Sequence, residues 1–136
     1  MELDIIRLLV DFGFMILIWA VQLVIYPSFR YYSKDNLVIW HRKYTQRVTL
    51  IVLPLMFSQL GLAGVQLFKV QNFYTISSIV IISVLWLLTF QLFVPLHQQI
   101  DRDEHNNSTT ERLVKFNWWR TLLWTLSCLG SLVYNV

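Results

Sequence analysis

The sequence is poor in charged residues and has a single cysteine. Only 14% of its 136 residues are charged and 56% are hydrophobic, which is too apolar for an ordinary soluble domain. Cys128 cannot form an intramolecular disulfide and sets no spacing for a metal site. The formal charge of +3 is too small and too dispersed to indicate a nucleic-acid partner. The composition therefore favours one membrane domain, residues 1–136.

Four apolar segments are each long enough to cross a bilayer, which takes about 20 residues of helix. They are Ile5–Tyr26, Val48–Phe68, Tyr74–Leu96 and Leu113–Tyr134. The first begins with Glu2 and Asp4 in place of a basic region and has no small-residue cleavage site, so we interpret it as a retained helix and not as a signal peptide. The sequence predicts an all-α integral membrane protein, an up-down-up-down bundle of four transmembrane helices.

Lysine and arginine are concentrated in the two loops that follow the first and third segments, 27–47 and 97–112. Four spans place these loops on one side of the bilayer and both termini on the other. Because basic loops stay in the cytoplasm, both termini are expected outside it.

Polar residues inside the apolar segments allow several interpretations. Asp11 either pairs with Arg7, four residues earlier on the same helix face, or lies at the outer interface. Gln22 is typical of a helix-to-helix contact. Ser108 and Glu111 fit a capping box that starts the fourth helix near Thr109.

A set of polar residues from three helices falls near the cytoplasmic boundary and is expected to line one mouth. Its members are His41, Tyr44, Arg47, Gln91, His97, Asn117 and Arg120. Arginine offers a fixed fork for anionic oxygen, and histidine exchanges protons near neutral pH. Such a mouth suits a lipid-like or quinone-like small molecule with an anionic or oxygen-rich head. Arg120 either lies deep and needs partners or extends to the surface.

A metal site is not expected. His41 and His97 can come together with Asp101 one turn beyond His97, but the sequence has no HxxxH or HExxH spacing. Cys128 has no histidine near it in sequence. We expect no metal and no cofactor.

Several short motifs resemble those of a group of small bacterial four-helix membrane proteins. They are Tyr26-Pro27-Ser28, Trp40-His41, Arg47, Val94-Pro95-Leu96-His97, Glu111-Arg112-Leu113, Asn117-Trp118-x-Arg120-Thr121 and Trp124-Thr125. That group is distantly similar to the DUF1772, or anthrone oxygenase-like, family. The resemblance implies a four-helix bundle in the bacterial inner membrane and, in the enzyme members, cofactor-free oxidation of a polycyclic phenol. His97 stands where that family commonly has asparagine.

Three functions remain open from the sequence. The first is a membrane protein that binds a hydrophobic or amphipathic molecule through Arg120, Asn117, Tyr44, Arg47 and Gln91. The second is a membrane enzyme of the oxygenase or isomerase type, with His97 or His41 as the general base and Arg120 and Asn117 stabilising an oxyanion. The third is a structural subunit of a larger membrane complex. Besides the lipid bilayer, a second copy in a homo-oligomer is left open as a partner.

Overall fold

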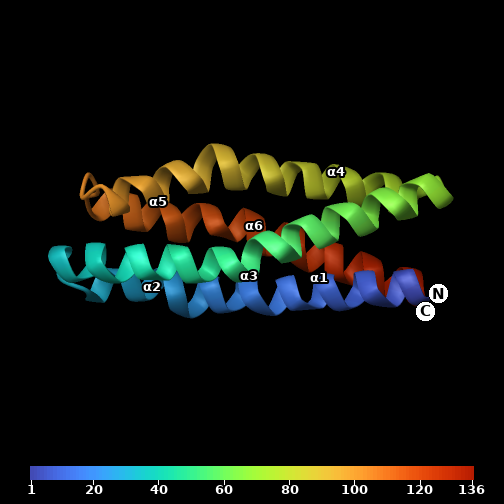
Figure 1. Cartoon of the computed structure of the whole chain (residues 1–136), viewed down its shortest axis with the longest axis horizontal. Coiled ribbons are helices and arrows are strands. Elements are labelled where there is room, and N and C mark those ends of the chain that lie inside the picture. The colour runs from blue at the N-terminus through green and yellow to red at the C-terminus, as the bar shows by residue number, and fades with distance from the viewer.

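The computed structural model describes residues 1–136 and contains helices and short connections but no β-strand. Four helical rods lie side by side (Figure 1). The first rod comprises α1 (Glu2–Ala20), η1 (Val21–Ile25), α2 (Tyr26–Ser28) and η2 (Phe29–Tyr31). The second is α3 (Lys34–Lys69), the third comprises α4 (Phe73–Leu88), η3 (Thr89–Phe93) and α5 (Val94–Asp101), and the fourth is α6 (Asn107–Asn135). The prediction of an all-α chain is confirmed.

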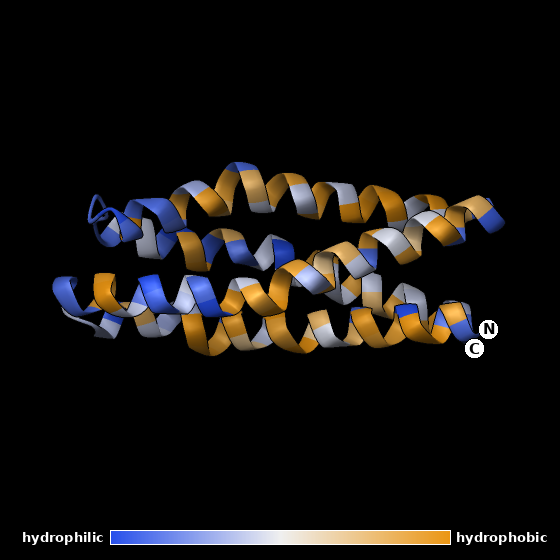
Figure 2. Cartoon of the chain, viewed as in Figure 1, coloured by the Kyte–Doolittle hydropathy of each residue, from blue (hydrophilic) through white to orange (hydrophobic).

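Hydrophobic residues predominate along the rods, and hydrophilic residues are more frequent toward the left-hand end of the view (Figure 2). Many large apolar side chains are exposed, among them Leu50, Phe57 and Leu126. Three helical stretches are long and apolar enough to cross a membrane: Glu2–Tyr31, Lys34–Lys69 and Phe73–Asp101. The α6 helix has a lower hydropathy because it carries polar side chains: Glu111, Arg112 and Lys115 near its start are exposed, whereas most of those from Asn117 to Ser131 face the other rods. Its buried polar residues are Asn117, Arg120, Thr121, Ser127 and Ser131, whereas Trp118, Trp119, Leu122, Leu126 and Leu129 are exposed. This polar-inside, apolar-outside pattern is the reverse of that of a water-soluble helix.

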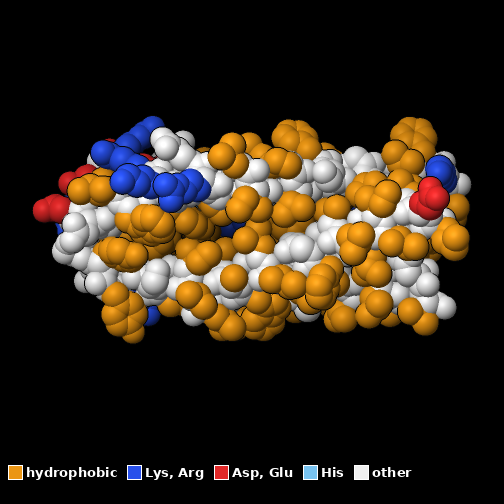
Figure 3. Space-filling view, turned by 60° about the horizontal axis from the view of Figure 1, so that its bottom comes forward, with side chains coloured by type: hydrophobic (Ala, Val, Ile, Leu, Met, Phe, Trp, Pro, Cys, Tyr) orange, Lys and Arg blue, Asp and Glu red, His pale blue; other side chains and the backbone are white.

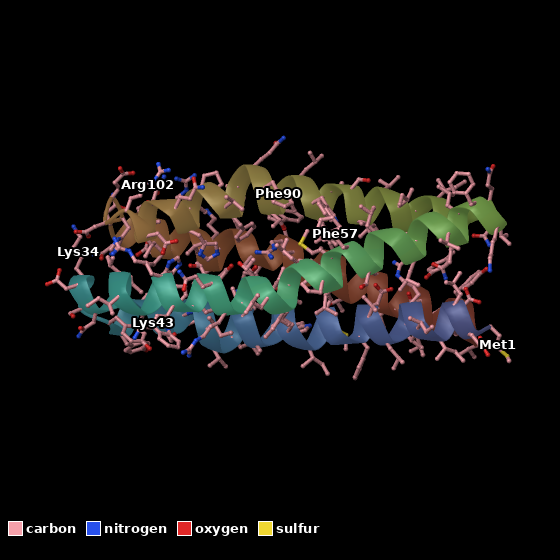
Figure 4. All side chains as sticks on the ribbon, viewed as in Figure 1. Met1, Lys34, Lys43, Phe57, Phe90 and Arg102 are labelled. Atoms are coloured by element: carbon pink, nitrogen blue, oxygen red, sulfur yellow. The ribbon has the colours of Figure 1, made fainter.

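The two ends of the molecule differ in charge. Both termini lie at one end, which we call the terminal end (Figure 1). The connections after Tyr31 and Asp101 lie at the opposite end, the loop end, where most lysine and arginine side chains gather (Figure 3). Figure 4 shows Lys34, Lys43 and Arg102 at the loop end and Met1 at the terminal end. The loop end is therefore the basic end.

The first and third rods share a local distortion next to a proline. In each, a five-residue π-turn directly precedes a residue followed by proline: η1 before Tyr26-Pro27 and η3 before Val94-Pro95. A proline has no N–H to donate and its ring clashes with the carbonyl four residues earlier, so a wider turn relieves the contact. Because a π-turn uses one residue more than an α-turn, every residue after it is rotated around the helix axis. Tyr26 and His97 both follow such a turn.

The start of α6 differs from the sequence prediction. The N-cap is Asn106, whose side chain accepts a hydrogen bond from the backbone N–H of Thr109, while the Thr109 hydroxyl bonds the Asn106 backbone. The capping box therefore begins two residues before Ser108, and Ser108 is exposed. Asparagine is favoured as the N-cap residue because its short side-chain amide oxygen reaches the backbone N–H of the third residue of the helix.

Removing this cap should destabilise the protein measurably. We expect Asn106→Ala to lower the free energy of unfolding by about 1 kcal/mol, as measured by denaturant unfolding in a neutral detergent with helicity as the signal. Ser108→Ala is the matched control and should change it by less than about 0.5 kcal/mol. A larger loss in Ser108→Ala than in Asn106→Ala would contradict the observed cap.

Candidate functional site

All four rods contribute to a buried polar network near the terminal end. Arg7 and Asp11 are both fully buried, and Arg7 Nε donates to Asp11 Oδ2 at 2.9 Å. The guanidinium also donates to Gln66 Oε1 at 3.2 Å, and to Ser78 and Ser127 hydroxyls at 2.7 and 3.3 Å. The predicted Arg7–Asp11 pair is thus formed, inside the bundle and not at its surface.

The carboxylate of Asp11 is equally well satisfied. It accepts a hydrogen bond from Gln59 Nε2 at 2.5 Å and another from the Ser131 hydroxyl. Every charge in this group, the Arg7 network, has several partners, and none of its residues lines the three main cavities of the molecule. A buried ion pair with complete hydrogen bonding is suited to fixing the register of helices. We assign the Arg7 network a structural role.

A cavity of about 310 Å³ lies between the rods toward the loop end. Its walls are mostly apolar and include Phe14, Val48, Met56, Phe93 and Trp124. Phe90, which also lines it, lies about midway along the molecule (Figure 4). The polar groups in its wall include Tyr26, Tyr44, His97, Asp101 and Arg120. An apolar cavity of this size with a few polar groups at one end is typical of a small-molecule site.

A row of hydrogen bonds joins the cavity to the loop end. Tyr26 Oη lies 2.9 Å from His97 Nε2, His97 Nδ1 lies 2.8 Å from His41 Nε2, and His41 Nδ1 lies 2.7 Å from Asp101 Oδ1. We call these four residues the histidine array. The Asp101 carboxylate is 30% exposed, whereas the His41 side chain is fully buried. The array thus joins Tyr26, in the wall of the cavity, through the buried His41 to a partly exposed carboxylate that lies at the rim of the same cavity.

The donors and acceptors of the histidine array can be assigned from chemistry. A carboxylate only accepts hydrogen bonds, so His41 Nδ1 donates to Asp101 and, in a neutral ring, His41 Nε2 accepts. His97 Nδ1 then donates to His41, and His97 Nε2 accepts the hydroxyl hydrogen of Tyr26. Arg120 Nη1 lies 3.5 Å from Tyr26 Oη and donates to it. All bonds therefore run in one direction, from a cation at the cavity to a carboxylate near water.

Asp101 is held in position by a second set of contacts. Arg42 Nε and Nη2 donate to the backbone carbonyl of Asp101 at 2.9 and 2.7 Å. The Thr45 hydroxyl lies 3.5 Å from Asp101 Oδ2. These contacts connect α3 to the end of α5 and orient the carboxylate toward His41.

Arg120 is a buried cation without a carboxylate partner. Only 6% of it is exposed, its Nε has no hydrogen-bond partner, and it forms no salt bridge. Its guanidinium instead lies 4.2 Å from the Phe93 ring centroid and 5.0 Å from that of Trp124. Aromatic faces attract a cation but do not neutralise it. Of the two expected positions of Arg120, deep or at the surface, the deep one is therefore observed.

The predicted mouth residues fall into two groups. Tyr44, His97 and Arg120 line the cavity, and His41 lies directly behind His97. The remaining three do not line it. Asn117 is buried against Gln22, to whose Oε1 its amide donates at 2.9 Å.

Arg47 and Gln91 are both exposed. Arg47 lies six residues after His41. Each three residues fall about 60° short of a full helical turn, so the Arg47 side chain is rotated by about 120° from His41 and faces away from the buried side. Gln91 lies in η3 and borders a separate shallow hollow with Leu60 and Leu87. The expectation that both residues join the mouth is not met by these positions.

Sequence reasoning missed Tyr26 as a site residue and did not give Asp101 a role beyond a weak metal hypothesis. Tyr26 looks like an interfacial aromatic at a helix end, and only the π-turn before it directs it inward. The spacing of Asp101 four residues after His97 was the available signal for the array.

No group of three or more histidine, cysteine or acidic residues is arranged to hold a metal ion.

Comparison of the chain with protein-family models, with curated proteins and with solved structures found no match. The similarity to anthrone oxygenase-like proteins therefore stays a prediction, and the function is inferred from the site itself.

Proposed function

We propose that this chain is an integral membrane protein that holds an amphipathic anion in the cavity beside Arg120. The observation that carries this proposal is the buried charge of Arg120 without a counter-ion. A cation in an apolar environment is strongly unfavourable unless it is paired. A ligand with an anionic head and an apolar body supplies the missing charge to Arg120 and fills the apolar part of the cavity.

The same proposal includes a topology of four membrane crossings with the loop end in the cytoplasm. Exposed tryptophan and leucine side chains on α6 support the fourth crossing, because they leave this helix apolar where it faces outward. The basic loop end supports the orientation. The cavity then opens near the cytoplasmic boundary of an inner membrane, where an amphipathic molecule from the bilayer has its head.

Binding of hexyl sulfate, a small permanent anion with an apolar tail, tests the proposal. We expect wild-type protein in a neutral maltoside detergent to bind it in a calorimetric titration. Arg120→Gln should weaken binding by about 30-fold or more, since removing one partner of a buried charge pair costs at least about 2 kcal/mol. Arg47→Gln is the matched control and should leave the affinity unchanged, because Arg47 is exposed and does not line the cavity.

Equal affinity in wild type and Arg120→Gln would contradict the proposal. So would an equal loss in Arg47→Gln, because it would assign the binding to the general basic charge of the loop end.

A further inference from the structure

The histidine array has a feature that binding alone does not require. A cation such as Arg120 holds an anion by itself, yet Tyr26 Oη, next to Arg120, begins an unbroken row of hydrogen bonds that ends at a partly exposed carboxylate. Three of these bonds lie between 2.7 and 2.9 Å. Groups at such distances can pass protons along the row.

Resting on the proposed function, we propose that the cavity accepts a neutral weak acid and that the histidine array removes its proton to the cytoplasmic side. The ligand class is an apolar molecule with one weakly acidic hydroxyl or carboxyl group. The neutral form is the one that dissolves in the bilayer, and the ionised form is the one that pairs with Arg120. The protein therefore converts the first into the second inside the cavity.

The transfer balances without an oxidant, reductant or cofactor. The acidic hydrogen of the ligand passes to Tyr26 Oη as the original hydroxyl hydrogen of Tyr26 passes to His97 Nε2. The hydrogen on His97 Nδ1 moves to His41 Nε2, which leaves His41 as an imidazolium beside the Asp101 carboxylate. The ligand anion then faces the Arg120 guanidinium and the new O–H of Tyr26. Asp101 finally passes the proton from His41 to water.

The surroundings of the histidine array suit this direction of transfer. The charged and titratable groups around it are Arg120, which donates to Tyr26, Tyr44, whose ring centroid lies 5.8 Å from that of His41, Arg42 at the Asp101 backbone, and His105 near His41. Arg120 favours the anion in the cavity, and the Asp101 carboxylate favours the imidazolium of His41. The charges at the two ends therefore separate the proton from the ligand.

The cavity also limits the size of the ligand. A volume of about 310 Å³ lies at the lower end of the range found for small-molecule sites. A single aromatic ring with small substituents, or a short chain with its acidic head, fits this volume. The probe 4-nitrophenol has this size and changes its absorbance on ionisation.

The experiment follows ionisation of 4-nitrophenol after rapid mixing with the protein, at a pH where the free probe is mainly neutral. In the wild type we expect nitrophenolate to form on the protein in a phase that is slower in D₂O. His41→Gln should slow this phase by about 10²-fold with little change in its final amplitude, because the equilibrium is set by Arg120 and not by the path of the proton. His41 does not line the cavity, so it acts through Tyr26 and His97. Lys43→Gln, two residues after His41 and on the exposed side of α3, should ionise the probe at the wild-type rate.

Each outcome distinguishes this inference from the proposed function. Hexyl sulfate, which carries no proton to lose, reports whether each variant has a folded cavity. If the wild type binds hexyl sulfate in an Arg120-dependent way but binds 4-nitrophenol in its neutral form, proton removal is wrong and anion binding stands. If folded His41→Gln ionises the probe as fast as the wild type, the histidine array is not the path. If neither probe depends on Arg120, the proposed function itself fails.

Discussion

Replacing Arg7 by leucine is expected to lower the free energy of unfolding by about 3–5 kcal/mol, because it leaves the Asp11 carboxylate buried without its cation. Asp11 is fully buried and would keep only the hydrogen bonds from Gln59 and Ser131. Gln66, Ser78 and Ser127 would each lose a bond from the same guanidinium. Denaturant unfolding in neutral detergent, followed by loss of helicity, measures this loss.

Two further variants make the test specific. Lys69→Leu removes a positive charge from the same end of the molecule but from an exposed position, and it should change stability by less than about 0.5 kcal/mol. Arg7→Leu combined with Asp11→Leu should recover part of the loss, since no unpaired charge then remains. If Arg7→Leu unfolds at the same denaturant concentration as Lys69→Leu, the Arg7 network does not stabilise the bundle as described.

Truncating Trp124 to alanine is expected to cost about 3–5 kcal/mol of unfolding free energy. Its side chain is almost fully buried and stacks on Phe14 with ring centroids 4.6 Å apart. The guanidinium of Arg120 packs against the face of its ring. Its Nε1 donates to Gln59 Oε1 at 3.3 Å. Trp124 therefore packs between the Arg7 network and the cavity and supports both.

The contributions of the ring and of the N–H can be separated. Trp124→Phe keeps a ring against Phe14 but leaves Gln59 Oε1 without a donor, which should cost about 1–3 kcal/mol. Trp119→Ala removes an equally large side chain that is 60% exposed, and it should cost far less than Trp124→Ala in the same unfolding experiment. Equal losses in Trp119→Ala and Trp124→Ala would mean that the buried packing of Trp124 is not what stabilises this region.

The helices could be predicted from the sequence because long apolar segments leave few alternatives. The four predicted spans all lie within the observed rods. The length of α3 was underestimated: its 36 residues extend well before Val48, because the polar residues at its start are packed against α5. Four membrane crossings are part of our proposal, since three of the rods meet the length and hydropathy expected of a span.

The site could be predicted only in part because helical periodicity loses its phase at a π-turn. Gln91 and His97 were predicted to share one mouth because both fall near the same boundary of the membrane, yet six residues already place them about 120° apart on a regular helix. The π-turn η3, which contains Gln91, changes this angle further, so that His97 lines the cavity while Gln91 stays exposed. The same effect in η1 directs Tyr26 to the cavity. Arg120 was recognised from its position in an apolar segment, and its aromatic neighbours explain how it is accommodated there. Side-chain pairing between rods, such as Asn117 with Gln22, depends on tertiary packing and is not encoded in local spacing.

Native mass spectrometry of gently solubilised protein tests the central claim most directly, because it needs no assumption about the identity of the ligand. The claim predicts that an anionic amphipathic molecule of defined mass accompanies the wild type and Arg47→Gln, and is lost from Arg120→Gln. The same bound mass in all three proteins, or none in any of them, would contradict a ligand site at Arg120.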